Sequence, residues 1–179
     1  MPDRISIIGN AGGEKSLFAL RIGRTLGIPV RVLDDVQWQP GWTRATPEVV
    51  RATHAGWLAE PRWIIDGWGP WDDITARFAL ADLIVVPDYP LAQHRAWAVQ
   101  RQAEVARGER RDWPPAGCDA APLTEELLAL IDLVESDFMP RIREMIQGAA
   151  HKAVHARSPE ALDDVARRLE LGRWPVRDD

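Results

Sequence analysis

Residues 9–16 of the chain, GNAGGEKS, have the residue types of a loop that binds phosphate groups. Glycines let a backbone curl around an anion, a lysine reaches the terminal phosphate oxygens, and a serine hydroxyl can hold Mg²⁺. The pattern for such loops is G-x-x-x-x-G-K-[ST], and Gly9, Lys15 and Ser16 fill three of its fixed positions. Glu14 stands where the second glycine belongs. The spacing therefore predicts a phosphate-binding loop with one departure.

The sequence on both sides of this loop has the pattern of a strand–helix–strand unit. Residues 4–9, RISIIG, are a β-branched run typical of a buried strand, and residues 16–27 carry apolar side chains at helical spacing. A second strand is expected at 28–34, IPVRVLD. Unpaired amides and the positive end of the dipole at a helix N-terminus favour an anion there. The pattern predicts an α/β protein with a parallel sheet and helices on its faces.

The rest of the chain continues this alternation. Further strands are expected at 62–67, 81–88 and 151–156, and further helices at 46–60, 124–147 and 158–171. The segment from Pro90 to about Arg111 is expected to be a helix followed by a mobile basic segment. The helix at 124–147 has a possible break before Pro140. Residues 36–42, VQWQPGW, predict a Pro-Gly turn flanked by Trp38 and Trp42, and residues 112–122 predict a loop.

Length, composition and charge limit the class of protein. A chain of 179 residues with 46% hydrophobic and 27% charged residues fits one globular domain. A net charge of −5 gives no electrostatic footprint for nucleic acid. The sequence predicts no membrane-spanning helix and no signal peptide. A single cysteine, Cys118, excludes an internal disulfide framework. We therefore expect a cytoplasmic protein without nucleic-acid or membrane partners.

Several blocks of the sequence resemble a known family. They are IIGNAGGEKS, LGIPVRVLDDVQWQPGW, RWIIDG, ARFALADLIVVPDYP and a later GC…MPRIRE region, and they span about residues 4–171. The chain resembles the P-loop kinases of the adenylate-kinase-like group, and most closely the DNA topology modulation (FlaR-like) proteins. The resemblance implies a three-layer P-loop NTPase fold with a parallel five-stranded sheet. It also implies one domain over 1–179, with a small helical lid at about 91–122.

The resemblance further implies an ATP- and Mg²⁺-dependent phosphotransferase that acts on a small acceptor. Lys15, Asp34 and Arg101 would be catalytic, with Asp34 as base or anchor for the attacked hydroxyl and Arg101 as a lid cation on the transferring phosphoryl group. Phosphoryl transfer agrees with such a set, because it needs positioned cations and little covalent help. The residues expected to contact the nucleotide are Gly9, Asn10, Ala11, Gly12, Gly13, Glu14, Lys15 and Ser16.

Metal and acceptor contacts are expected beside the loop. Ser16 and Asp66 would hold Mg²⁺, and Arg77 together with Asp34 would contact the acceptor. Trp38 and Trp42 follow Asp34 closely enough to line the acceptor pocket, although indoles are more often part of a core. The arginines of the 90–111 region also have a plainer interpretation as a solvated helix face.

Departures from the family pattern leave a second function open. Glu14 places a carboxylate in the loop, Trp68 stands where a small polar residue follows Asp-Gly, and Trp97 stands near an expected arginine. These changes favour a pseudo-kinase or binding module that has lost nucleotide binding and uses a Trp-lined cleft for another ligand or partner. A third interpretation is a loop that holds a phosphorylated or sulfated substrate. The sequence does not decide between a monomer and a homodimer.

Overall fold

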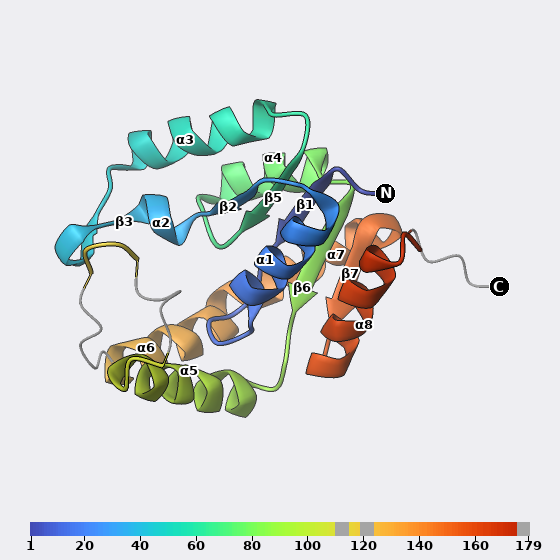
Figure 1. The fold of residues 1–179 in the computed structure, drawn as a ribbon. Coiled ribbons are helices and arrows are strands. Elements are labelled where there is room, and N and C mark those ends of the chain that lie inside the picture. Colours follow the sequence, from blue (N-terminus) through green and yellow to red (C-terminus); the bar gives the residue numbers. More distant parts are fainter. Residues whose placement is uncertain (110–114, 119–123, 175–179) are drawn as a thin grey trace.

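The structure is a computed structural model that describes residues 1–109, 115–118 and 124–174. Its main sheet has five strands: β1 (Arg4–Ile7), β2 (Val30–Val32), β5 (Trp63–Asp66), β6 (Leu83–Pro87) and β7 (Ala153–Ala156). They lie in the order β2-β5-β1-β6-β7, and every pair is parallel. The predicted α/β class with a parallel five-stranded sheet is confirmed (Figure 1).

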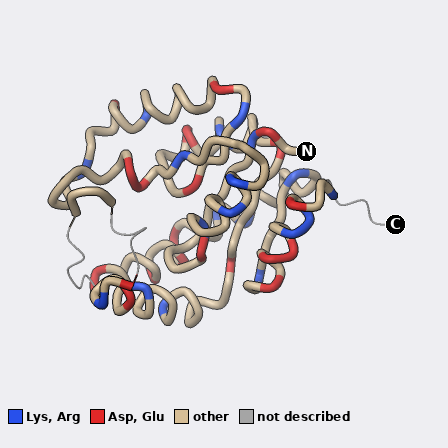
Figure 2. The backbone as a smooth tube through the Cα atoms, viewed as in Figure 1, with Lys and Arg blue, Asp and Glu red and all other residues tan. Residues whose placement is uncertain are grey.

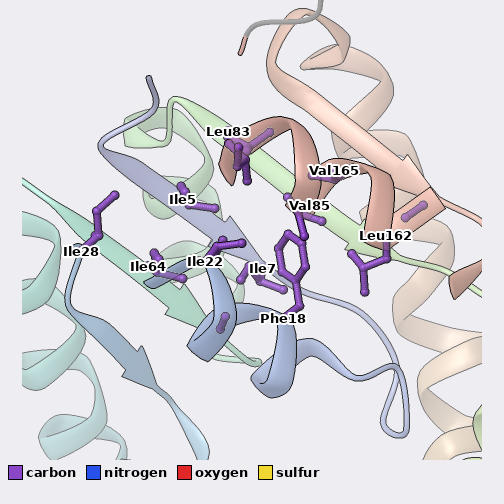
Figure 3. Packing of buried hydrophobic residues seen from close by; sticks show 14 of the residues in the cluster. Ile5, Ile7, Phe18, Ile22, Ile28, Ile64, Leu83, Val85, Leu162 and Val165 are labelled. Atoms are coloured by element: carbon purple, nitrogen blue, oxygen red, sulfur yellow. The ribbon is translucent and has the colours of Figure 1, made fainter. Parts of the chain in front are cut away.

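Helices cover both faces of the sheet. On one face, α1 (Lys15–Leu26) and α8 (Pro159–Glu170) pack on the strands and bury a cluster that includes Phe18, Ile22 and Leu162 (Figure 3). On the other face, the second cluster joins the sheet to α3 (Pro47–Ala59), α4 (Trp71–Leu80) and α7 (Met139–Gly148). A strand that is covered on both faces needs apolar side chains at every position. This explains the apolar run Leu83–Val86 of β6, in which every residue is fully buried. The three-layer arrangement follows from these two clusters.

Ion pairs join α1 to α8 on one face of the sheet. Arg21 of α1 donates to both Asp163 and Glu170 of α8, with each shortest distance at 2.6 Å. Acidic and basic residues both occur along α8 (Figure 2). Within this helix Arg167 pairs with Asp163 and Arg168 with Asp164. These exposed pairs add little stability each, so the apolar cluster beneath them holds the two helices on the sheet.

The region after β2 differs from the sequence prediction. The strand ends at Val32, before the predicted end at residue 34, and Asp34 begins the short helix α2 (Asp34–Gln37). The predicted turn at 36–42 contains a two-stranded hairpin, β3 (Trp38–Gln39) and β4 (Thr43–Arg44), around a 3₁₀ turn at Pro40–Trp42. Gly41 has a φ of 72° in this turn, a conformation that glycine adopts at little cost.

The long helix expected at 124–147 is divided into three parts. α6 (Thr124–Leu133) passes into a π-helical segment at Val134–Phe138, and α7 then begins at Met139. Pro140 lies in the first turn of α7, where its missing N–H is least costly. The predicted break before Pro140 is therefore present, in the form of a π segment.

Part of the predicted lid lies among the described residues. α5 (Leu91–Ala106) is the helix expected at the start of this segment, and Gly108 follows it with a φ of 71°. Gly117 and Cys118 reach the hairpin, because the Gly41 N–H donates to the Gly117 carbonyl at 2.9 Å and the Cys118 thiol lies 3.3 Å from the Gln39 carbonyl. The remaining arginines of the basic segment, at 110 and 111, lie outside the described residues.

The sheet brings three chain segments to one edge. Asp66, the last residue of β5, is level with Ile7 of β1 and with Val32 of β2. The loop at 9–14 leaves β1 at this edge, and Asp34 follows β2 at the same edge. Among the described residues, no helix is long and apolar enough to cross a membrane.

Candidate phosphate-binding site

The loop at 9–14 is held in a tight curve between β1 and α1. Gly12 has a φ of 73°, and a Cβ there would lie 2.5 Å from the His94 carbonyl oxygen. A Cβ at Gly9 would lie 2.5 Å from the Pro87 carbonyl oxygen. Both glycines are required by close backbone approach, so their place in the motif has a steric reason.

Glu14 adopts the left-handed conformation that its position demands. Its φ and ψ are 55° and 18°, and it is the N-cap of α1. Its carboxylate makes no capping hydrogen bond and is exposed. A non-glycine residue in this region costs about 1–2 kcal/mol relative to the right-handed form. The loop thus keeps the backbone geometry of the motif even though the glycine is replaced.

Three successive carbonyl oxygens of the loop accept hydrogen bonds from side chains. Trp68 Nε1 donates to the Gly9 carbonyl at 2.8 Å, and Lys15 Nζ donates to the Asn10 carbonyl at 2.8 Å. His94 Nδ1 lies 2.9 Å from the Ala11 carbonyl oxygen. A carbonyl oxygen repels an anion, and a donor bound to it weakens that repulsion. These contacts favour the binding of a negatively charged ligand in the loop.

Asn10 ties the loop to the rest of the molecule. It is fully buried, and its Nδ2 donates to the Ile131 carbonyl of α6 at 2.9 Å. Its Oδ1 accepts from the Ala11 N–H at 2.8 Å, which removes that amide from the set available to a ligand. Asn10 was predicted to contact the nucleotide, and the structure gives its side chain these internal partners.

Lys15 lies near the carboxylates of Asp34 and Asp66. Burial lowers the pKa of Lys15, and the charges of Asp66 and Asp34 oppose that shift. The Arg101 guanidinium also acts on this ammonium and lowers its pKa further. Lys15, Asp34, Asp66 and Arg101 therefore share one electrostatic environment. A lysine held beside two carboxylates and a loop carbonyl is well placed to reach phosphate oxygens.

Ser16 and Asp66 have the donor groups that Mg²⁺ prefers. The Ser16 hydroxyl donates to Asp66 Oδ2 at 2.6 Å. Asp66 is 2% exposed, and its Oδ1 accepts no hydrogen bond from any residue in the described part of the chain. Burial raises the pKa of Asp66, while Lys15 and the Ser16 hydrogen bond lower it. An unpartnered buried carboxylate oxygen beside a hydroxyl fits a hard cation with oxygen ligands.

Ser16 and Asp66 would form a minimal Mg²⁺ site. Within residues 1–109, 115–118 and 124–174, no three His, Cys, Asp or Glu side chains cluster as metal ligands. Mg²⁺ commonly takes one or two protein ligands and completes its shell with water and substrate phosphates. The residues present therefore fit Mg²⁺ bound together with a phosphate ligand.

Asp34 lies in the first turn of α2, close to Lys15. The Leu33 N–H donates to the Asp66 carbonyl at 2.9 Å, which fixes the start of this helix against β5. Burial raises the pKa of Asp34, and Lys15 and Arg101 partly offset the shift. A carboxylate with a raised pKa is suited to accept a proton from a hydroxyl group. The same region includes Asp35, whose pKa is raised by burial and by Asp34.

The outer wall of the site is formed by α5. The loop and this helix enclose a hollow lined by Gly12, Glu14, Trp97, Gln100, Arg101 and Glu104. Arg101 thus lies beside the loop, where the prediction placed it. Trp97 contributes an indole to this wall and packs edge-on against Tyr89, with 5.5 Å between ring centroids. The hollow combines an aromatic face with one guanidinium and two carboxylates.

Arg77 is fully buried, so its side chain does not reach the surface of the site. Its Nη2 donates to the Gly67 carbonyl at 3.0 Å. Burial lowers the pKa of Arg77 to about 10, and the charges of Asp66 and Asp73 oppose the shift. In this structure Arg77 contacts the turn after Asp66, and its predicted role in acceptor binding stays a prediction.

Trp38 and Trp42 lie together on the hairpin that follows α2. Their rings meet edge to face at 5.5 Å, and the Arg44 guanidinium lies 4.9 Å from the Trp38 ring centroid. Both side chains are half-buried. The structure places them next to the helix that carries Asp34, and their contact with an acceptor stays a prediction.

Two residues that contact the loop were not identified from the sequence as loop contacts. Trp68 and His94 donate to loop carbonyls from positions that are 59 and 83 residues away in sequence. In the sequence, Trp68 was singled out only as a departure from a family pattern. No local spacing signals these contacts, because they depend on how β5, β6 and the loop meet in the sheet.

Comparisons with known proteins bear on the fold. No protein-family profile matches the chain. No curated protein matches it either. Shikimate kinase from Acinetobacter baumannii, solved in complex with shikimate, is similar with a TM-score of 0.54 and 14% identity, covering 97% of this chain and 96% of that chain. Shikimate kinase from Bacteroides thetaiotaomicron is similar with a TM-score of 0.53 and 12% identity, covering 96% of this chain and 98% of that chain. The fold of the chain is therefore that of the P-loop kinases, while closeness to the FlaR-like proteins stays a prediction.

Proposed function

We propose that the protein is a phosphotransferase that moves the terminal phosphoryl group of a nucleoside triphosphate, such as ATP, to a small acceptor. The observation that carries the proposal is the convergence of Lys15, Asp34, Asp66 and Arg101 at the mouth of the phosphate-binding loop. This set offers two cations for phosphate charge and two carboxylates with different surroundings. The similarity to kinases of the same fold supports it at the level of the class.

The proposed reaction assigns a task to each side chain. The loop and Lys15 hold the β- and γ-phosphates, and Arg101 draws charge from the transferring group. Asp34 orients the acceptor hydroxyl and takes its proton as the oxygen–phosphorus bond forms. The bond between the γ-phosphorus and the bridging oxygen breaks, and the nucleoside diphosphate leaves. Ser16 and Asp66 would hold Mg²⁺, which when bound neutralises charge on the β- and γ-oxygens.

The test begins with nucleotide binding. Calorimetry with ATP and MgCl₂ is expected to show binding, and Lys15→Met is expected to lower the affinity by at least tenfold, because its ammonium is the loop's own cation. A panel of small hydroxylated and phosphorylated acceptors, shikimate included, is then screened for ADP release. Absence of ATP binding at millimolar concentration by the folded protein would contradict the proposed function.

A second candidate function is a binding module that has lost nucleotide affinity. The observation that favours it is the Glu14 carboxylate, which sits next to Lys15 at the N-terminus of α1, where an anion would bind. Thermal-shift screening with ATP, diphosphates, sulfate and sugar phosphates distinguishes the two. Absence of stabilisation by any of these anions would favour this alternative, whereas stabilisation by phosphorylated or sulfated small molecules without any by nucleotides would indicate a loop that holds such a substrate.

A further inference from the structure

His94 joins two backbone segments through one imidazole ring. It lies in the first turn of α5 and is fully buried. Its Nε2 accepts a hydrogen bond from the Tyr89 N–H at 3.2 Å, and its Nδ1 lies 2.9 Å from the Ala11 carbonyl oxygen. A neutral imidazole has one donor and one acceptor nitrogen. Because an amide can only donate, Nε2 is the acceptor, and Nδ1 carries the hydrogen that is donated to Ala11.

The same residue also sets the space available to the loop. A Cβ at Gly13 would lie 3.1 Å from His94 Cε1, and a Cβ at Gly12 would lie 2.5 Å from the His94 carbonyl oxygen. On its other side the imidazole stacks on Tyr89, with 5.4 Å between centroids and 21° between planes. The middle of the loop therefore rests on both the backbone and the ring of His94.

We propose that His94 is a positioning residue for the phosphate-binding loop, which in its neutral Nδ1–H form fixes the loop in the curve that receives a polyphosphate. The proposal rests on the proposed function for the nature of the ligand. It does not make His94 a catalytic residue, because the ring is buried behind the loop and reaches it through a carbonyl oxygen. His94 acts through Ala11, Gly12 and Gly13.

The charge state of the ring follows from its surroundings. Burial lowers the pKa of His94, and the hydrogen bond to the Ala11 carbonyl opposes that shift. The charged groups that act on the ring are Lys15, which also lowers its pKa, and Asp88 and Glu135, which raise it. Protonation would place a hydrogen on Nε2 against the Tyr89 N–H. The repulsion between these two hydrogens is expected to displace the ring and, with it, the Nδ1 donor from the Ala11 carbonyl. Acidification is therefore expected to weaken polyphosphate binding by loosening the bond to Ala11.

Three substitutions separate the two hydrogen bonds. In His94→Asn the amide nitrogen can take the place of Nδ1 and keep the bond to Ala11. In His94→Gln the amide oxygen can take the place of Nε2 and keep only the bond to Tyr89. His94→Ala removes both. His151, which is exposed, provides the matched control as His151→Asn.

Two measurements are made on folded variants of the full chain. Calorimetry with tripolyphosphate and with ATP is expected to show affinity near wild type for His94→Asn and His151→Asn. His94→Gln and His94→Ala are expected to lose about tenfold, since a lost hydrogen bond to a buried acceptor weakens binding on this order. Amide hydrogen exchange of residues 11–14 without ligand is expected to accelerate in the same two variants only. As the pH falls below the usual range of imidazole titration, the affinity of wild type is expected to fall more steeply than that of His94→Asn.

The outcomes are distinguishable. Equal hydrogen exchange and equal affinity in all variants would overturn the role of His94, and so would a loss in His94→Asn as large as that in His94→Gln. If wild type binds neither polyphosphate, the proposed function fails. Hydrogen exchange then decides the role of His94 alone, because faster exchange in His94→Gln and His94→Ala supports it and unchanged exchange overturns it.

Discussion

The Ser16 hydroxyl and the Asp66 carboxylate meet at 2.6 Å although they are 50 residues apart in sequence. Ser16 lies in the first turn of α1, and Asp66 is the last residue of β5. Parallel pairing of β1 with β5 places Asp66 level with Ile7, which lies two residues before Gly9, the first residue of the loop. The contact therefore depends on strand register, and it joins the start of the helix to the neighbouring strand.

The first prediction concerns this pair. Asp66→Asn removes the negative charge that attracts a divalent cation. We therefore expect the Mg²⁺ concentration that supports half-maximal ATP binding and turnover to rise by at least tenfold. Titration of Mn²⁺ in the presence of ATP, followed by electron paramagnetic resonance, measures the cation affinity directly. Asp72→Asn, on the exposed part of α4, is the control. Equal Mn²⁺ affinity in Asp66→Asn and wild type would contradict the assignment.

The second prediction concerns Glu14, where charge and backbone strain act together. Glu14→Gly removes both, and Glu14→Gln removes the charge while it keeps a side chain at a φ of 55°. We expect both variants to bind ATP about tenfold more tightly than wild type, because an exposed carboxylate next to a phosphate is screened but still repulsive.

Comparison of Glu14→Gly with Glu14→Gln identifies whether charge or backbone strain limits the affinity for ATP. If only Glu14→Gly gains affinity, backbone strain and not charge limits the site. If neither gains affinity, the carboxylate turns away from the ligand and the argument for lost nucleotide binding is wrong. Urea unfolding accompanies both measurements, since relief of the left-handed strain is expected to stabilise Glu14→Gly by up to about 1 kcal/mol.

The site was predictable from the sequence where it depends on local pattern. The glycine-rich turn between a β-branched run and an amphipathic segment indicated Lys15 and Ser16, and the family resemblance implied the roles of Asp34 and Asp66. Chemistry at the carboxyl ends of parallel strands needs only the strand assignment.

Other features needed the folded chain. The local sequence around Arg77 does not indicate that its side chain is buried. In the structure, Arg77 of α4 is fully buried and interacts with the charge of Asp66. His94 has no sequence neighbour with which to form a motif, because its partners are backbone groups of Ala11 and Tyr89. The hairpin after Asp34 depends on Gly41 and on the Gly117 contact across the chain. Pairings of this kind are set by tertiary geometry and leave no periodic signal.

The third prediction concerns the indole of Trp68. Trp68→Phe keeps an aromatic ring beside Trp71 and Phe138, whose centroids lie 6.0 Å and 5.6 Å from the Trp68 ring, and removes the donor to Gly9. We expect a loss of about 1 kcal/mol in the free energy of unfolding and a fall of about fivefold in tripolyphosphate affinity. Trp71→Phe, which alters the same aromatic cluster without touching the Gly9 carbonyl, is the control. Equal affinities in the two variants would show that the bond to Gly9 has no part in binding.

The fourth prediction uses the ion cluster at the end of β6. Asp88 accepts two hydrogen bonds from the Arg143 guanidinium, at 2.7 Å and 2.6 Å, and a third contact from His155 Nε2. Burial alone would raise the pKa of the Asp88 carboxyl, but the hydrogen bonds from Arg143 and His155 outweigh it and lower the pKa. A carboxyl whose pKa is lower in the folded state contributes stability above its unfolded pKa and loses that contribution as the pH falls through its folded pKa.

We therefore expect Asp88→Asn to reduce the free energy of unfolding by about 3 kcal/mol at pH 7, because it leaves Arg143 with only Glu135 as a charged partner in the described structure. Urea unfolding from pH 7 downwards measures the difference from wild type. That difference is expected to stay constant to about pH 4 and to narrow below it, since acid protonates Asp88 in wild type and has nothing to protonate in the variant. Glu144→Gln lies at an exposed position of α7, the helix that carries Arg143, and should have the same free energy of unfolding as wild type at every pH. A difference that persists unchanged to the lowest pH at which both proteins fold would show that Asp88 acts through packing and not through its charge.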